Sequence, residues 1–172
     1  KSVKFISVAD GTLAKTIQHD DNIWDINFSL DGKNVVTGSQ DGTVKITSLN
    51  KSSIDKTIQY EGSVHNCSFS PNGKYLQSYV RTEEGFELKI IDLVTDTQVF
   101  TYRFDKPINA TFSSNGEYVI TSALYWRRFR DSLDSNTHTL RALEDIKIFR
   151  ISNGELVFFK DSVFYKVISP DR

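Results

Sequence analysis

The chain has 172 residues, which is enough for one domain with its own core, and its 38% hydrophobic and 25% charged residues are typical of a soluble globular protein. A formal net charge of −1 excludes a global basic field that would hold nucleic acid or an anionic membrane. No apolar run approaches the roughly 18–20 residues of a membrane span, and the single cysteine excludes an internal disulfide or a CxxC metal site.

The chain opens on two predicted strands, Ser2 to Val8 and Leu13 to Gln18, and continues into its best-formed stretch, Ile23 to Leu49. Within that stretch the pairs Asp31-Gly32 and Asp41-Gly42 indicate tight turns, because glycine tolerates a positive φ. These turns divide the region into four short strands, predicted at 23–29, 34–39, 43–48 and about 54–59.

Two markers show that this unit recurs roughly every 40 residues along the chain. The first is a Phe-Ser pair followed by a turn, at Phe28-Ser29, Phe69-Ser70 and Phe112-Ser113, with a partial copy at Ile168-Ser169. The second is a lysine between two apolar residues, at Lys4, Lys45, Lys89 and Lys147. Because two independent markers keep the same register, the second and third units are expected to repeat the four strands, with third strands at 87–92 and 145–151.

The segment from His19 to Ile46, which ends in SQDGTVKI, resembles the unit of the WD-repeat family of β-propellers. The resemblance extends over essentially the whole chain and implies an all-β fold in which each blade has four antiparallel strands. The Trp-Asp pair that ends the family's unit is missing. Other pairs stand in its place: Thr47-Ser48, Ile91-Asp92 and Phe149-Arg150.

The repeat predicts about three full blades and partial blades at both ends. We expect the end of one blade at 1–18, blades at 19–60, 61–104 and 105–160, the last with an insertion at 124–144, and the start of a further blade at 161–172 that includes a strand at 163–169. A propeller ring usually needs four to eight blades, so the chain is expected to be part of a larger propeller. The remaining blades would come from the same chain, a second copy or another subunit.

His19, Ser39 and Asp41 have the residue types of a hydrolase triad. The family resemblance implies instead a structural hydrogen-bond network, in which Asp41 orients the buried imidazole and Ser39 extends the chain of hydrogen bonds. No nucleophile elbow supports an enzyme, so we expect no catalytic residue. His65 and Cys67 lie two apart on one predicted strand. We expect them to pack rather than to form a dyad or a metal pair, and we predict no cofactor and no metal.

The insertion Leu124 to Glu144 is the largest departure from the repeat. By topology it lies on the same face as the loops that enter each first strand, and loops on a rigid scaffold often carry function. It interleaves aromatic residues with arginines: Tyr125, Trp126, Arg127, Arg128, Phe129 and Arg130. Three interpretations stay open: packing back onto the blade with solvated arginines, contact with a protein or peptide, and RNA or phosphoinositide binding through the arginines.

Trp24 is a second candidate, because it is expected near the channel mouth on that same face. An exposed tryptophan there would suit a protein contact, and packing against a neighbouring blade is the alternative. The resemblance implies a non-catalytic scaffold that docks a protein or peptide, often within a larger complex, with nucleic acid less favoured. The single Cys67, and N-x-S/T sequons at Asn27, Asn66 and Asn109 inside predicted innermost strands, indicate the cytoplasm or nucleus.

Overall fold

The computed structural model describes the backbone of residues 1–50, 55–130 and 138–166, and the side chains of the same ranges except 124–144 and 161–166. Over these ranges the chain forms fourteen β-strands. They are β1 (Ser2–Ile6), β2 (Leu13–Gln18), β3 (Ile23–Phe28), β4 (Asn34–Ser39), β5 (Thr43–Ser48), β6 (Lys56–Gln59), β7 (Ser63–Phe69), β8 (Tyr75–Thr82), β9 (Gly85–Asp92), β10 (Thr97–Phe104), β11 (Asn109–Phe112), β12 (Tyr118–Arg130), β13 (His138–Arg150) and β14 (Leu156–Lys166). None of the described residues forms a helix with the length and apolar character that a membrane crossing requires.

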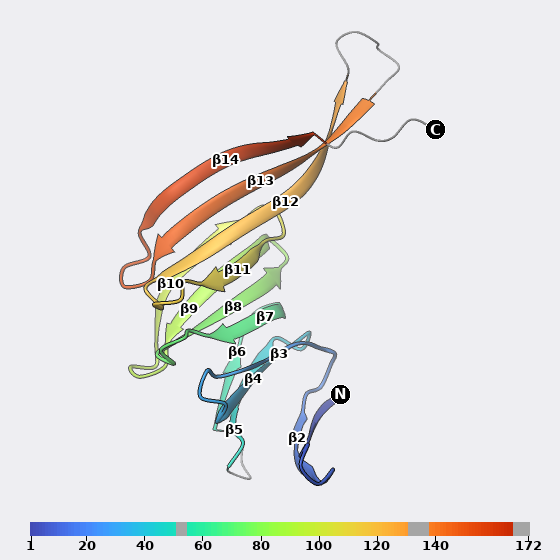
Figure 1. Cartoon of the computed structure of the whole chain (residues 1–172), viewed down its shortest axis with the longest axis vertical. Helices are drawn as coiled ribbons and strands as arrows, with labels where there is room; N and C mark the ends of the chain where they lie inside the picture. The colour runs from blue at the N-terminus through green and yellow to red at the C-terminus, as the bar shows by residue number, and fades with distance from the viewer. Residues whose placement is uncertain (51–54, 131–137, 167–172) are drawn as a thin grey trace.

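The strands pair in chain order into three four-stranded antiparallel sheets and one two-stranded sheet. We call them sheet A (β1–β2), sheet B (β3–β6), sheet C (β7–β10) and sheet D (β11–β14). Each full sheet is a meander that begins with its edge strand β3, β7 or β11, and the sheets follow one another along the long axis of the molecule (Figure 1). The predicted all-β fold of four-stranded antiparallel units, with a partial unit at the start of the chain, is confirmed.

The Phe-Ser marker closes the first hairpin of each full sheet. The hydroxyl of Ser29 accepts a hydrogen bond from the backbone N–H of Asn34 at 2.9 Å and donates to the Asp31 carboxylate at 2.6 Å. Ser70 and Ser113 repeat both bonds, at 2.8 and 2.7 Å and at 3.0 and 2.6 Å, with an asparagine as the acceptor. A serine followed two residues later by Asp or Asn fixes this turn, which explains why the marker recurs.

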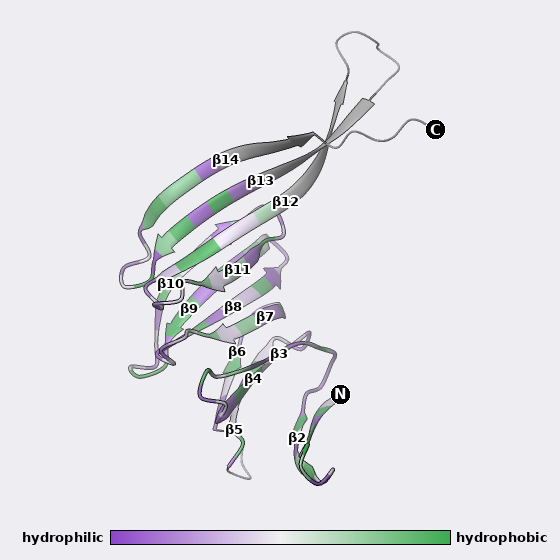
Figure 2. Ribbon diagram, in the orientation of Figure 1, coloured by the Kyte–Doolittle hydropathy of each residue, from purple (hydrophilic) through white to green (hydrophobic). Residues whose placement is uncertain are grey.

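Two apolar clusters join the sheets, and Figure 2 shows apolar and polar residues alternating along the strands that supply them. The first cluster joins sheets B and C and contains Val36, Val44, Val64, Leu76 and Val80. The second joins sheets C and D and contains Leu88, Ile90, Val119 and Phe149. Sheets B and C approach closely at Gly38, where an added Cβ would lie 2.7 Å from a methyl group of Val64.

Side-chain hydrogen bonds to the backbone link sheet B to sheet C and sheet C to sheet D. The Asp25 carboxylate of β3 accepts from the backbone N–H of Cys67 on β7 at 2.8 Å, and the Asn27 amide donates to the Cys67 carbonyl at 2.9 Å. Between sheets C and D the Gln77 amide donates to the carbonyl of Ala110 at 3.0 Å. Because these bonds are directional, they fix how each sheet lies against the next.

Sheet D differs from the predicted plan in two places. The insertion is not a loop throughout, because 124–130 extend β12 and 138–144 extend β13, whereas 131–137 lie outside the described residues. The strand predicted at 163–169 is not a separate strand, because 163–166 continue β14 and pair with 141–144; residues 167–169 lie outside the described part. No glycine or proline interrupts residues 156–166, and the aromatic and β-branched residues there favour one continuous strand.

Candidate functional site

One end of the sheets gathers the connections into each inner strand, at 19–22, 60–62 and 105–108, and the turns between second and third strands, at 40–42 and 83–84. We call this end the proximal face. Successive connections of an antiparallel meander alternate between its two ends. The β12–β13 hairpin therefore extends from the proximal face as well, as the sequence predicted.

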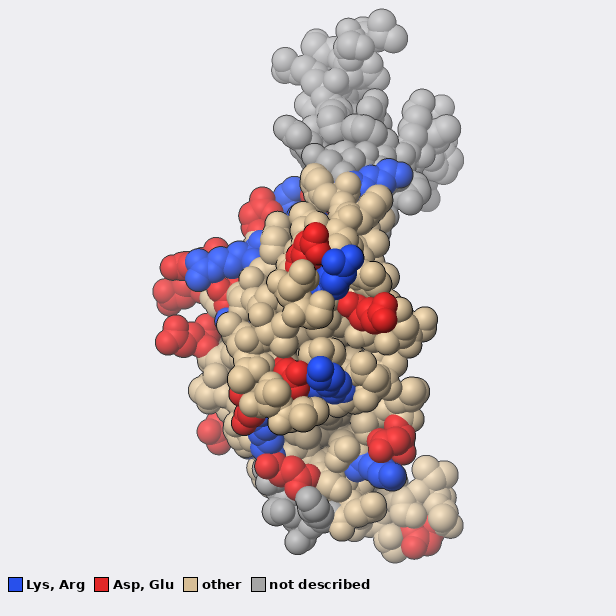
Figure 3. Space-filling view, turned by 90° about the vertical axis from the view of Figure 1, so that its left-hand side faces the viewer, with Lys and Arg blue, Asp and Glu red and all other residues tan. Residues whose placement is uncertain are grey.

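The opposite end, the distal face, carries charges that pair with one another. Lys74 lies 3.4 Å from the Asp92 carboxylate, and Arg150 lies 2.7 Å from that of Glu155. Figure 3, which faces the left-hand side of Figure 1, shows basic and acidic side chains next to one another with uncharged surface between them. These charges therefore largely satisfy each other.

His19 is the centre of a hydrogen-bond network at the proximal face and is only 3% exposed. Its Nδ1 lies 2.7 Å from the Thr43 hydroxyl, and its Nε2 lies 2.7 Å from the Thr37 hydroxyl. The Thr43 hydroxyl donates to the Asp41 carboxylate at 2.6 Å. Asp41 also accepts from the backbone N–H of Asp20 and of Thr43, both at 2.8 Å. The network therefore fastens the loop 19–22 to the turn 40–42.

The protonation states of this network follow from its geometry. Burial alone would raise the pKa of Asp41, but hydrogen bonds from Thr43 and Asp20 hold that pKa far below its ordinary value, so Asp41 is ionised. An ionised carboxylate only accepts, so the Thr43 hydroxyl donates to it and accepts from Nδ1–H of His19. The Nε2 atom then accepts from the Thr37 hydroxyl. Both ring nitrogens of His19 therefore have hydrogen-bond partners within the chain, and neither is free to take a proton from a substrate.

Ser39 joins the network through Asp41 rather than through the imidazole. Its hydroxyl does not bond to the imidazole. It accepts from the backbone N–H of Asp41 at 3.2 Å and donates to the carbonyl of Asp21 at 3.4 Å. Thr43 and Thr37 make the contacts with the ring instead. The sequence could have indicated Thr37 as a ring contact, because it lies two residues before Ser39 and so on the same face of β4.

Acidification is expected to destabilise the fold through His19. Burial, and after it the charge of Lys45, lower the pKa of His19 below the ordinary 6.5. The unfolded chain therefore takes up the proton first as the pH falls, so stability is constant above that value and is lost below it. Urea unfolding midpoints between about pH 7.5 and about pH 5.5 measure this loss. The His19→Gln variant should show a flatter slope, and an unchanged slope would contradict the assignment.

The next two repeats replace His19 with aromatic residues and keep its surroundings. The Tyr60 hydroxyl bonds to that of Ser78, the counterpart of Thr37, at 3.2 Å. The ammonium group of Lys89 lies 5.7 Å from the centroid of the Tyr60 ring, and that of Lys147 lies 5.5 Å from the Phe104 ring. The recurring lysine of the third strands β9 and β13 thus covers the last residue of the preceding unit by a cation–π contact.

Trp24 is 52% exposed and stacks on His65 across the seam between sheets B and C. The ring centroids lie 5.5 Å apart and the ring planes differ by 12°. Each residue is the extra one at a β-bulge, because the ladder pairings of β3 and β7 both skip a residue at these positions. A bulge re-aims the side chain it carries, so two bulges place the two rings in one stack near the proximal face.

Cys67 does not form a reactive pair with His65. The Cys67 side chain is fully buried, and burial raises the pKa of its thiol well above the ordinary value. A thiol in such surroundings is inert, because the thiolate is the reactive form. Among the described residues there is also no group of three His, Cys, Asp or Glu residues that could hold a metal ion.

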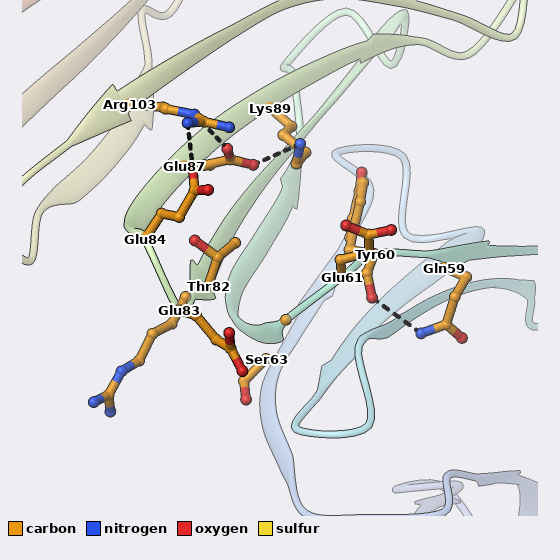
Figure 4. Close-up of a pocket in the computed structure, with 12 residues that line it drawn as sticks. Gln59, Tyr60, Glu61, Ser63, Thr82, Glu83, Glu84, Glu87, Lys89 and Arg103 are labelled. Carbon is orange, nitrogen blue, oxygen red and sulfur yellow. Dashed lines mark hydrogen bonds and ion pairs between the residues drawn. The ribbon is translucent and has the colours of Figure 1, made fainter.

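A groove of about 970 Å³ opens at the proximal face between sheets B and C. One of its lining residues, Glu87, is 7% exposed and pairs with Lys89 at 2.7 Å and with Arg103 at 2.8 Å. Arg103 also pairs with Glu84 at 2.5 Å. Figure 4 shows these three pairs as dashed lines on one wall of the groove, with Tyr60 and Gln59 on the other. The groove is open, strongly charged and bordered by strands of two sheets.

Residues 5–48 match the model of the family described as WD domain, G-beta repeat. That segment is therefore a repeat of the WD type. A solved structure described as the crystal structure of the eukaryotic initiation factor shares the fold, with a TM-score of 0.68 and 17% identity. That similarity covers 90% of this chain and 36% of the other, so this chain spans little more than a third of that structure. The comparison with curated proteins found no match.

The three four-stranded units fill the position of the missing tryptophan with buried side chains of very different size. Phe149 is fully buried, Ile91 is 8% exposed, and Thr47 is fully buried. The Thr47 hydroxyl has no hydrogen-bond partner in the described part of the chain. The first unit therefore keeps the histidine network but leaves the adjacent tryptophan position occupied by a poorly satisfied polar group.

Thr47→Val is expected to raise the free energy of unfolding by about 1 kcal/mol, because it removes a buried hydroxyl without a partner and keeps the side-chain shape. Thr37→Val is the matched control, since Thr37 is equally buried but bonds to Nε2 of His19. That variant should lose about 1–2 kcal/mol. Urea denaturation of both variants tests this, and shifts of the same sign would contradict it.

For the predicted binding residues of the insertion, the structure describes the backbone alone. The backbone of Tyr125, Trp126, Arg127, Arg128, Phe129 and Arg130 lies in β12 and pairs with β13. Their side chains lie outside the described residues. Their role as binding residues therefore stays a prediction, as does that of Trp24, whose position at the proximal face the structure does describe.

Proposed function

We propose that the chain is a non-catalytic scaffold that docks a protein or peptide partner on its proximal face, within a larger assembly. WD-repeat domains are generally scaffolds of this kind. The observation that carries the proposal is the exposed Trp24–His65 stack, which two bulges place beside the groove. Tryptophan is among the residues most enriched in binding hot spots. The β12–β13 hairpin, which extends from the same face, supplies a second contact.

The hairpin can be shortened without removing any of the described core side chains, although 164–166 of β14 then lose their partners 141–143. Replacing residues 125–143 with Asn-Gly keeps Leu124 paired with Glu144 as the last pair and closes the strands with a two-residue turn. Cross-linking followed by mass spectrometry then compares the partners of the wild type, this variant and Trp24→Ala. We expect both variants to lose the same partners at an unchanged melting temperature. Lys33→Ala on the distal face is the control, and equal partner sets in all four proteins would contradict the proposal.

We also propose that two further strands complete sheet A. The lysine marker aligns β1 with the third strands β5, β9 and β13, so its free edge corresponds to the side where a second strand pairs. Apolar side chains beside it are uncovered: Ile6 is 61% exposed, Phe28 56% and Ile26 42%. The source of the two strands is another segment, a second copy or another subunit.

An added hairpin tests the completion of sheet A. Residues 22–42 contain the β3–β4 hairpin together with the turn that leads into a third strand. A second copy of this segment ahead of Ser2 would supply both strands in the expected register. We expect a higher melting temperature and slower amide exchange in β1, since its free edge becomes paired. A melting temperature equal to that of the wild type would contradict the proposal.

The alternative of RNA or phosphoinositide binding depends on Arg127, Arg128 and Arg130. The charges of these residues lie in the part of the hairpin whose side chains the structure does not describe. This alternative differs from protein docking in one expected result: binding should weaken steeply as salt is added.

A further inference from the structure

We propose that the groove between sheets B and C binds an arginine side chain of a partner peptide, and that the peptide continues across the Trp24–His65 stack. This inference names the kind of partner for the proximal face and so rests on the proposed function. The groove is the part of the proximal face where charge, burial and an aromatic surface meet.

The charges that line the groove leave carboxylates in excess. Seven charged residues line it: Glu61, Arg81, Glu83, Glu84, Glu87, Lys89 and Arg103. Two of the cations, Lys89 and Arg103, are held by Glu87 and Glu84. In Figure 4 no dashed line joins Glu61 or Glu83 to another lining residue. The two carboxylates outnumber the remaining lining cation, Arg81.

The paired cations do not make the groove an anion site. Glu87 is nearly buried, and an anion that drew Lys89 or Arg103 away would leave its carboxylate without a partner. An unpaired buried charge is costly, so these two cations remain paired with Glu87. Lys89 is further held over the Tyr60 ring. A cationic side chain instead meets Glu61 and Glu83 without breaking any existing pair.

The aromatic stack favours arginine over lysine. One face of the Trp24 ring rests on His65, and half of the Trp24 side chain is exposed. A planar guanidinium stacks on such a ring and forms two parallel hydrogen bonds to a carboxylate, whereas an ammonium group does neither. His65 follows the lining residue Ser63 by two positions on β7, which is about 7 Å along the strand. A peptide of a few residues therefore spans the groove and the stack.

Fluorescence anisotropy with labelled Gly-Ser peptides tests this proposal. One peptide carries three arginines, the second three lysines and the third three glutamates. We expect the arginine peptide to bind most tightly, the lysine peptide several-fold more weakly, and the glutamate peptide not at all. The double variant Glu61→Gln, Glu83→Gln should lower the affinity for the arginine peptide about tenfold, and Trp24→Ala several-fold.

The matched control is the double variant Asp96→Asn, Glu117→Gln, which removes the same charge from exposed residues of the distal face. We expect it to bind the arginine peptide as the wild type does. Equal losses in the two double variants would reduce the effect to net charge and overturn the site, as would an absence of arginine-peptide binding. Partners that depend on the hairpin but not on Glu61 and Glu83 would overturn this inference alone and leave the proposed function standing.

Discussion

Gly62→Ala is expected to lower the free energy of unfolding by about 3 kcal/mol. Gly62 has a φ of +147°, which L-residues rarely adopt. An added Cβ would lie 2.3 Å from the carbonyl oxygen of Arg81 and 3.2 Å from a methyl group of Val80. The first of these is a backbone atom of the neighbouring strand, so the loop into β7 has to move and the pairing of β7 with β8 is disturbed.

Gly73→Ala separates the steric effect from the backbone strain. Gly73 also has a positive φ, +69°, but an added Cβ there meets nothing within 4 Å. Strain alone should therefore lower the stability of that variant by about 1 kcal/mol. Chemical denaturation of the two variants, with the wild type, gives both values. Equal losses at the two positions would show that Arg81 does not confine Gly62, and would contradict the close approach.

Phe149→Ala is expected to lower the free energy of unfolding by about 3–5 kcal/mol. Phe149 is fully buried at the tryptophan position of the third unit, with its ring centroid 4.6 Å from that of Tyr102 and 5.8 Å from that of Phe100. Its removal leaves a cavity between sheets C and D that the close-packed side chains around it do not fill easily. The loss should appear as a lower urea midpoint with an unchanged dependence on urea concentration.

Phe158→Ala is the control for this substitution, because Phe158 lies on β14 of the same sheet and is 46% exposed. Its removal leaves no closed cavity, so the loss should stay within about 1 kcal/mol. Similar losses for the two phenylalanines would mean that Phe149 does not anchor sheet D on sheet C.

Much of the fold was predictable because the same local chemistry recurs along the chain. The serine of the Phe-Ser marker forms a hydrogen-bonded turn, and the lysine of the second marker, at Lys89, makes a cation–π contact with the preceding unit. The first is local and the second joins equivalent positions of successive units, so the spacing of the two markers indicates the strand order. The end of β14 was not predictable in the same way, since residues 163–166 have the composition of a new strand as much as of a continued one.

The candidate site was less predictable, because it depends on contacts between units. The sequence placed His19 and Asp41 in one network, but Thr43 and Ser39 are both within two residues of Asp41, and only geometry distinguishes them. The stack of Trp24 on His65 depends on two bulges, which have no glycine or other mark in the sequence. The groove joins residues from two sheets, and its ion pairs follow from packing rather than from spacing.

Every sheet pairs only strands that are adjacent in the sequence, so each one folds from a short segment with little loop-closure entropy. The same connectivity governs the mechanical response. A force that pulls the two ends of the chain apart opens hairpins one hydrogen bond at a time, beginning with the sheet that has the fewest partners. Sheet A has a single ladder of five residue pairs, so it should yield first. Unfolding under load is then stepwise from the amino-terminal end, one sheet after another.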